Sequence, residues 1–175
     1  MPRNKFGELL IPSERIAAWQ RRFPSFEPSS AQLIFSIRAL AQRINDNANE
    51  WLAPFGLTAT KFNYLAVICS VEREGMTLLE IGALVRTSSG TVTTMVKVLE
   101  RDGFVKRSVN RDDGRSIRIK PTSKGRAAIE NAWALHHRNI ETIVAGMSRA
   151  KRAELLTSVV ALGGRLEDHK PQRGR

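Results

Sequence analysis

Positive charge is concentrated between residues 86 and 126. This stretch holds eleven lysine or arginine residues and four acidic ones, so it contributes +7 of the chain's formal charge of +11. A strongly basic balance predicts a polyanionic partner, either nucleic acid or an anionic membrane surface. Because most of the charge lies in this one stretch, it marks a binding site as well as supporting solubility.

A helix in this stretch is predicted from Ser88 to Asp102. Its apolar residues follow the i, i+3, i+4, i+7 spacing of one buried face, and they are Val92, Met95, Val96 and Leu99. The other side is small or hydroxylic near the N-terminus, which suits close approach to base edges in a major groove and to a phosphate. The predicted DNA contacts here are Ser88, Ser89, Gly90, Thr91, Thr93, Thr94 and Lys97. The alternative is a solvated face on an ordinary helical bundle.

A basic hairpin is predicted next, with strands at residues 104–109 and 116–120. In the second strand Ile117 and Ile119 alternate with Arg118 and Lys120, the period of a half-buried strand. An arginine at a hairpin tip can enter a narrow minor groove. The predicted DNA contacts on the hairpin are therefore Arg107, Arg111, Arg115 and Arg118, with surface solubility as the alternative. Asp112 and Asp113 either orient a neighbouring arginine, which makes Asp113 a candidate, or simply form the turn.

Further helices are expected on both sides of this stretch. One spans residues 13–22, with Ser13 as a possible cap and Pro24 ending it. Another spans residues 30–53, and its apolar residues recur at three- and four-residue steps; they are Leu33, Ile37, Leu40, Ile44, Ala48 and Trp51. A third starts at Thr58 or Thr60. A short helix at residues 77–85 precedes the helix at Ser88, and it is expected to bury Leu78, Ile81, Leu84 and Val85.

After the hairpin, Pro121 is expected to break the second strand. Helices at residues 122–146 and 148–162 then follow, and Gly163-Gly164 is expected to end the last one before a disordered basic tail from Arg165. The predicted fold is mainly α with a small β-hairpin wing, in the layout of a winged helix-turn-helix. The predicted divisions are an arm and short helix (1–29), a long helix (30–56), the winged lobe (57–121), C-terminal helices (122–168) and a basic tail (169–175).

Residues 57–127 resemble the MarR family of bacterial regulators. The family's recognition-helix pattern falls on Ser88 and on the run Thr91-Val92-Thr93, and it continues with Leu99-Glu100 and Gly103-Phe104-Val105. Its wing pattern, Asp-Pro-x-Asp-x-Arg, falls on residues 110–115, where it matches at Asp113 and Arg115 and departs at Asn110 and Arg111. Thr94 stands where family members often carry arginine, which predicts a different base preference.

The resemblance implies a homodimeric transcription regulator whose terminal helices interlace with those of a second copy. It implies a double-stranded, pseudo-palindromic DNA operator and, usually, repression released by a small effector of aromatic, phenolic or acyl-CoA-like chemistry. The candidate effector-binding residues are Trp19, Phe35, Arg38, Trp51, Phe62 and Tyr64. The alternative for the aromatic ones is that they fill the core and the dimer interface.

Other chemistries find little support in the residues. Cys69, the one cysteine, predicts a reducing compartment, and its apolar helix face favours a core position over a redox sensor. His136 and His137 are adjacent, which is not a metal-ligand spacing, so no metal or cofactor is expected. No phosphate loop or nucleophile triad is present, and an enzyme is not predicted. No membrane span or signal peptide is expected, which predicts a cytoplasmic protein.

Two rival functions remain open from the sequence. A sequence-tolerant architectural DNA-binding protein would need little more than the charge of +11. A winged helix can also serve as a protein-interaction module with no role at DNA.

Overall fold

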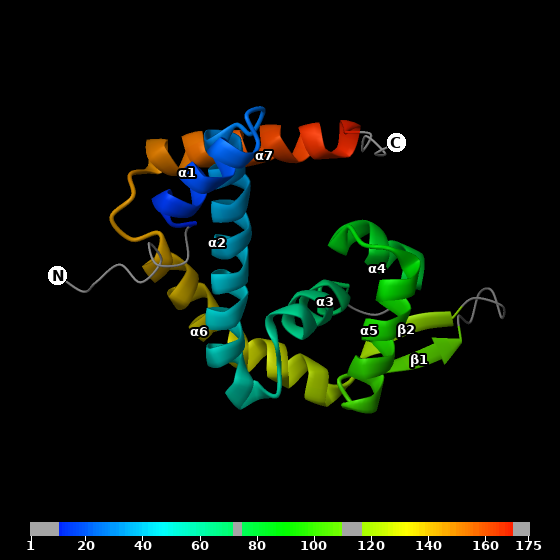
Figure 1. The fold of residues 1–175 in the computed structure, drawn as a ribbon. Helices are drawn as coiled ribbons and strands as arrows, with labels where there is room; N and C mark the ends of the chain where they lie inside the picture. Colours follow the sequence, from blue (N-terminus) through cyan, green and yellow to red (C-terminus); the bar gives the residue numbers. More distant parts are fainter. Residues whose placement is uncertain (1–10, 72–74, 110–116, 170–175) are drawn as a thin grey trace. The chain divides into compact units, whose positions relative to one another are not determined.

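The chain is mostly helical, with one two-stranded hairpin (Figure 1). The computed structural model describes residues 11–71, 75–109 and 117–169. The elements in chain order are α1 (Ser13–Arg22), α2 (Pro28–Leu52), the 3-10 turn η2 (Ala53–Phe55), α3 (Ala59–Cys69), α4 (Leu78–Val85), α5 (Ser89–Arg101), β1 (Val105–Val109), β2 (Ile117–Pro121), α6 (Ser123–Ile143) and α7 (Arg149–Asp168). The predicted fold class is confirmed.

The contacts divide the chain into two compact units, Met1–Ala134 and Leu135–Arg175. The first contains α1 to α5, the hairpin and the first half of α6, and the second contains the rest of α6 and α7. Within the described ranges, no helix is both long enough and apolar enough to cross a membrane.

Side-chain caps decide where several helices begin. Thr58, Ser88 and Ser148 each accept a hydrogen bond from an amide in the first turn of α3, α5 and α7. α4 begins with a full capping box, because Thr77 and Glu80 each accept the other's backbone N–H. The prediction for Ser13 is wrong: α1 has Pro12 at its N-cap and no side-chain cap, and Ser13 lies inside the first turn.

α2 begins two residues earlier than predicted. The Glu27 carboxylate accepts the amides of Ser29 at 3.0 Å and Ser30 at 2.6 Å, and Pro28 fits the first helical position because it needs no amide partner there. Hydrogen bonds from Ser30 and Ser29 lower the pKa of Glu27 to about 2. The sequence pattern missed this start because glutamate is not a usual N-cap.

The predicted end of α7 is wrong. The helix passes through Gly163 and Gly164 and continues to Asp168, so Arg165 is helical and does not begin a disordered tail. Neither glycine has a positive φ. Glycine in a helix interior costs about 1 kcal/mol relative to alanine, which weakens a helix without breaking it.

The hydrophobic core lies in the first unit, among the C-terminal end of α2, α3, α4, α5, the hairpin and the start of α6. Its fully buried large side chains are Leu52, Leu65, Ile68, Ile81, Val92, Val96, Leu99 and Ile119. Leu84 was predicted to be buried but is 60% exposed, because it lies on the side of α4 that carries Glu80 rather than the side that carries Ile81.

The long apolar stripe of α2 is only partly buried. Ala48 is in the core, and Trp51 is half-buried against it. Four apolar residues nearer the N-terminus are 37–54% exposed in the single chain, and they are Leu33, Ile37, Leu40 and Ile44. No other element of the same unit covers this part of the helix enough to bury it.

The hairpin is fixed at its base to the helices. β1 and β2 are antiparallel with Val105 opposite Pro121, so Pro121 is the last residue of the strand rather than a break before it. Thr122 donates its hydroxyl to the Gly103 carbonyl at 2.7 Å and accepts the Gly125 amide at 3.1 Å. Gly125 lies so close to the Phe104 carbonyl that a β-carbon would collide with it.

Candidate nucleic-acid interface

α4, a tight turn and α5 form a helix-turn-helix. Arg86 ends α4 in the left-handed conformation with φ 51°, and Thr87 donates its amide to the Gly82 carbonyl at 3.2 Å. Gly82 allows the two helices to cross closely, since a β-carbon there would be 3.2 Å from Val92 Cγ2. The turn thereby sets the angle at which α5 leaves α4.

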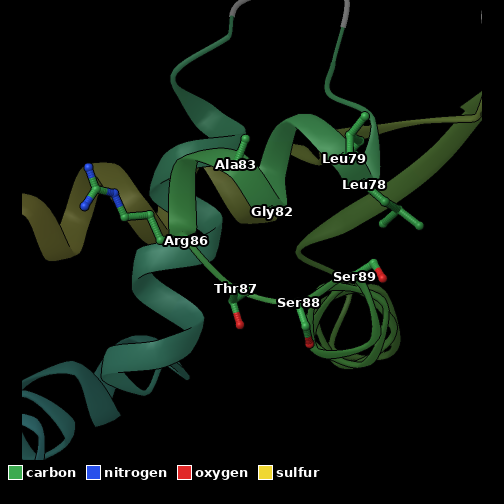
Figure 2. Close-up of a pocket in the computed structure, with 8 residues that line it drawn as sticks. All are labelled: Leu78, Leu79, Gly82, Ala83, Arg86, Thr87, Ser88 and Ser89. Atoms are coloured by element: carbon green, nitrogen blue, oxygen red, sulfur yellow. The ribbon is translucent and has the colours of Figure 1, made fainter. Parts of the chain in front are cut away.

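A cleft of about 430 Å³ lies beside this turn, between α4 and the start of α5 (Figure 2). Ser88 and Ser89 line it where α5 begins, and the Arg86 side chain extends away from both serines. Ser88 is exposed, and its hydroxyl also caps α5. Its hydroxyl accepts the Thr91 amide at 3.4 Å and shares a 3.0 Å hydrogen bond with the Thr91 hydroxyl.

The exposed side of α5 is a stripe formed by Gly90, Thr94, Lys97 and Arg101, which we call the outer stripe. It lies opposite the fully buried Val92, Val96 and Leu99, as the helical period requires. Thr94 donates its hydroxyl to the Gly90 carbonyl at 3.0 Å. Lys97 is exposed and has no ion pair among the described residues.

Two predicted contacts flank this stripe. Ser89 is exposed next to the N-cap, and Thr93 is half-buried at the side of the helix. The Thr93 hydroxyl donates to the Ser89 carbonyl at 2.9 Å. Of the predicted α5 contacts, the structure therefore gathers Gly90, Thr94 and Lys97 on the outer stripe and places Thr93 away from it.

The two wing arginines that the structure describes have protein partners. Arg107 of β1 binds Glu100 of α5, with 3.0 Å between Nε and Oε2. Arg118 of β2 donates from Nη1 to the Gly75 carbonyl at 3.0 Å and lies 3.8 Å from the Glu80 carboxylate at the start of α4. These contacts connect one strand to α5 and the other to α4, and we call them the wing braces. Arg111, Asp112, Asp113 and Arg115 lie outside the described residues.

The C-terminal end of α5 is held by charges that sequence reasoning missed. Lys61 of α3 binds Asp102 at 2.7 Å, and Arg101 binds the same carboxylate at 3.0 Å. Hydrogen bonds from Lys61 and then Arg101 hold the pKa of Asp102 below its ordinary value. Lys124 of α6 also donates to the Asp102 carbonyl at 2.7 Å. An acidic residue at a helix C-terminus interacts unfavourably with the helix dipole. The position of Asp102 in the sequence could therefore have indicated that it binds a cation.

The six candidate effector residues do not form one cluster within a single chain. Phe35 and Trp51 are both on α2 but sixteen residues apart, which is about 24 Å along a helix. Trp19 of α1 makes an edge contact with Phe26, with ring centroids 5.8 Å apart. Phe35 and Arg38 are exposed on the N-terminal half of α2.

The other aromatic residues belong to the core side of the first unit. Phe62 and Tyr64 are buried, as the core-filling alternative expects, and Trp51 is half-buried. Phe62 stacks on Trp133 of α6 with ring centroids 6.1 Å apart, although Trp133 is itself 49% exposed. Trp133 was not among the sequence candidates.

The cysteine and histidines fit structural positions. Cys69 is half-buried against the core, and burial raises the pKa of its thiol, which disfavours the reactive thiolate. Burial, and then the neighbouring His137, lowers the pKa of His136. Within the described part of the chain, no group of three or more metal-ligating side chains occurs.

A helix-turn-helix followed at once by a braced hairpin defines a winged helix-turn-helix protein, and comparison with known proteins gives its family. Residues 57–117 match the MarR family. The chain is 32% identical to the HTH-type transcriptional regulator TtmR of Methylorubrum extorquens over 134 residues, which are 75% of this chain and 66% of TtmR. It is 25% identical to the HTH-type transcriptional repressor YetL of Bacillus subtilis, covering 72% of this chain and 75% of YetL.

A solved structure agrees with these matches. The M. tuberculosis transcriptional regulator MosR in complex with DNA is 30% identical, with a TM-score of 0.64, over 77% of this chain and 96% of that chain. This chain belongs to the MarR family of DNA-binding transcription regulators, whose members are not enzymes.

Proposed function

We propose that this protein is a sequence-specific repressor that binds double-stranded DNA with α5 in the major groove and the wing beside it. The observation that carries the proposal is the outer stripe of α5, which is exposed opposite a fully buried face and combines small, hydroxylic and basic residues. A helix with this surface fits the major groove, where base pairs are distinguishable. The proposal of repression is supported by the similarity to the repressor YetL.

The positive charge of the wing is divided between two tasks in this proposal. Arg111 and Arg115 contact phosphates and the minor groove, with Asp113 orienting them. Arg107 and Arg118 serve as positioning residues, because their guanidinium groups already bind Glu100, Gly75 and Glu80. Charge therefore supplies affinity at the tip of the wing and holds its base to α4 and α5.

The active species in this proposal is a homodimer on a pseudo-palindromic operator. The N-terminal half of α2 exposes a large apolar stripe, and α7 has no buried residue at all in the single chain. Its exposed apolar residues are Leu155, Leu156, Val159, Val160 and Leu166. Large exposed apolar side chains on each of these two helices support an interface with a second copy, and a two-fold dimer matches half-sites about one helical turn apart.

A small effector would act on this dimer. We propose aromatic, phenolic or acyl-CoA-like chemistry. The first residues to test are the stacked Phe62 and Trp133, because Trp133 combines an aromatic partner with 49% exposure, and then Trp51, which packs against the core that contains Phe62. A ligand that binds only the folded state raises its melting temperature. A thermal-shift screen of these ligand classes tests this part, and a response unchanged by Trp133→Ala would exclude the Phe62–Trp133 stack.

Selection of duplexes from a random pool tests the main proposal. The selected duplex and its scrambled counterpart are then titrated with the protein at one fixed salt concentration. A specific regulator binds the selected duplex at least about 10³-fold more tightly. A ratio near one would instead favour the architectural protein for which the charge of +11 suffices.

A further inference from the structure

We propose that Thr94 is a specificity-determining residue that recognises the C5-methyl group of one thymine in each half-site. The inference rests on the proposed function, because it requires α5 to lie in the major groove. It goes further by assigning one side chain to one chemical group on DNA. Three observations on α5 support it.

The first observation is the position of Thr94. It lies in the middle of the outer stripe, opposite the buried Val92 and Val96, and it is exposed. One turn earlier, Gly90 has open space around the position of a β-carbon, with no atom within 4 Å. The absence of a side chain at Gly90 allows the floor of a groove to come close to this part of the helix.

The second observation is the state of the Thr94 hydroxyl. Its proton is donated to the Gly90 carbonyl at 3.0 Å. Donation to the O6 or N7 acceptors of guanine would require loss of this hydrogen bond. With its donor engaged, the side chain keeps an acceptor oxygen and an apolar γ-methyl group for contact with DNA.

The third observation is the lack of charge at this position. A side chain without charge adds little to phosphate attraction, so its contribution depends on the base edge that it meets. In the major groove, the C5-methyl group of thymine is the apolar feature of a base pair, and threonine methyl groups are suited to contact it. The geometry of Thr94 therefore favours thymine over the other bases.

The test removes the C5-methyl group of thymine and the γ-methyl group of Thr94 separately. A duplex selected from a random pool by the full-length protein is resynthesised with each thymine in turn replaced by deoxyuridine, which lacks only the C5-methyl group. At one thymine per half-site, this change should weaken binding of the unchanged protein about fourfold, the factor expected for one buried methyl group.

Variants at Thr94 identify the partner of that methyl group. Thr94→Ser keeps the hydroxyl and loses the methyl group, so it should bind the thymine and deoxyuridine duplexes equally. Thr94→Val keeps the methyl group and should retain the fourfold difference. Thr142→Ser is the matched control, because Thr142 of α6 makes the same kind of bond to the Arg138 carbonyl, at 2.9 Å, outside the winged lobe.

The outcomes separate this inference from the proposed function. If Thr94→Ser keeps the full sensitivity to deoxyuridine, or if no thymine is sensitive in the unchanged protein, Thr94 does not read a thymine methyl group although specific binding stands. If the pool yields no duplex preferred over its scrambled counterpart, the proposed function fails and this inference fails with it.

Discussion

Replacing Arg118 with alanine distinguishes a wing brace from a DNA contact. The Arg118 side chain is 23% exposed, donates to the Gly75 carbonyl at 3.0 Å and lies 3.8 Å from Glu80. A hydrogen bond from a charged group contributes about 1.5–3 kcal/mol. Because the side chain is partly hydrated and its carboxylate contact is long, we expect Arg118→Ala to lower the free energy of unfolding by about 1.5 kcal/mol. For a chain of this size the melting temperature should fall by about 3–6 °C.

The effect on DNA binding is measured as the slope of log affinity against log salt concentration. Each phosphate contact contributes about 0.9 to the magnitude of this slope. If Arg118 only positions the wing, Arg118→Ala weakens binding while the slope stays the same. If it were a phosphate contact, a dimer would lose about 1.8 from the slope.

Lys97→Ala is the matched control. Lys97 is exposed on the outer stripe without an ion pair among the described residues, so its removal should leave the melting temperature unchanged. It should reduce the slope by about 0.9 for each subunit if Lys97 contacts a phosphate. An Arg118→Ala protein that behaves like Lys97→Ala, with a reduced slope and an unchanged melting temperature, would refute the brace.

The remaining predictions concern the base of the lobe, the glycine under the wing and the interface between subunits. The pKa of Asp102 is lowered in the folded state by Lys61, so its contribution to stability is present above the ordinary value of 3.8 and is lost as pH falls through the lower folded value. Unfolding measured between about pH 5 and pH 2.5 should therefore show a smaller acid loss for Asp102→Asn than for the unchanged protein; equal losses would count against the Lys61 contact. Gly125→Ala should destabilise the lobe by more than about 2 kcal/mol, since its β-carbon would collide with the Phe104 carbonyl; a fully stable variant in a denaturant titration would contradict the packing. Val159→Glu places a charge on the exposed apolar face of α7, and sedimentation should show a shift from dimer to monomer, whereas an unchanged mass would exclude this face from the interface.

The helices of the winged lobe could be predicted nearly to the residue because their signals are local. The face of α5 repeats with the helical period, Ser88 begins this helix as its N-cap, and Thr58 is the one of the two predicted starts of α3 that caps it. The hairpin followed from alternation at Ile119 and its neighbours. In each case the sequence near the element contains the information.

What the sequence did not predict depends on contacts between elements or on small energy differences. Arg107 and Arg118 bind Glu100 and the Gly75 carbonyl, which belong to other parts of the chain. Their residue type therefore predicted a positive charge but not the protein group that each arginine binds. Two glycines predicted a helix end that α7 passes through. The candidate effector residues were chosen by chemical type, and the structure shows which of them lie in or against the core: Phe62 and Tyr64 are in it and Trp51 packs against it, whereas Phe35 and Arg38 are exposed.

Affinity cleavage of DNA from α5 tests the central claim most directly. In a Cys69→Ser background, Lys97→Cys on the outer stripe provides a single attachment point for an iron chelate that cuts nearby sugars. If α5 lies in the major groove of two half-sites, cleavage of the selected duplex should fall in two clusters about 10 base pairs apart. A second variant, Val159→Cys in the same Cys69→Ser background, carries the chelate on α7 as the control. Cleavage spread evenly along the duplex, or cleavage seen with the α7 variant and not with the α5 variant, would contradict the assignment of α5 as the element that reads DNA.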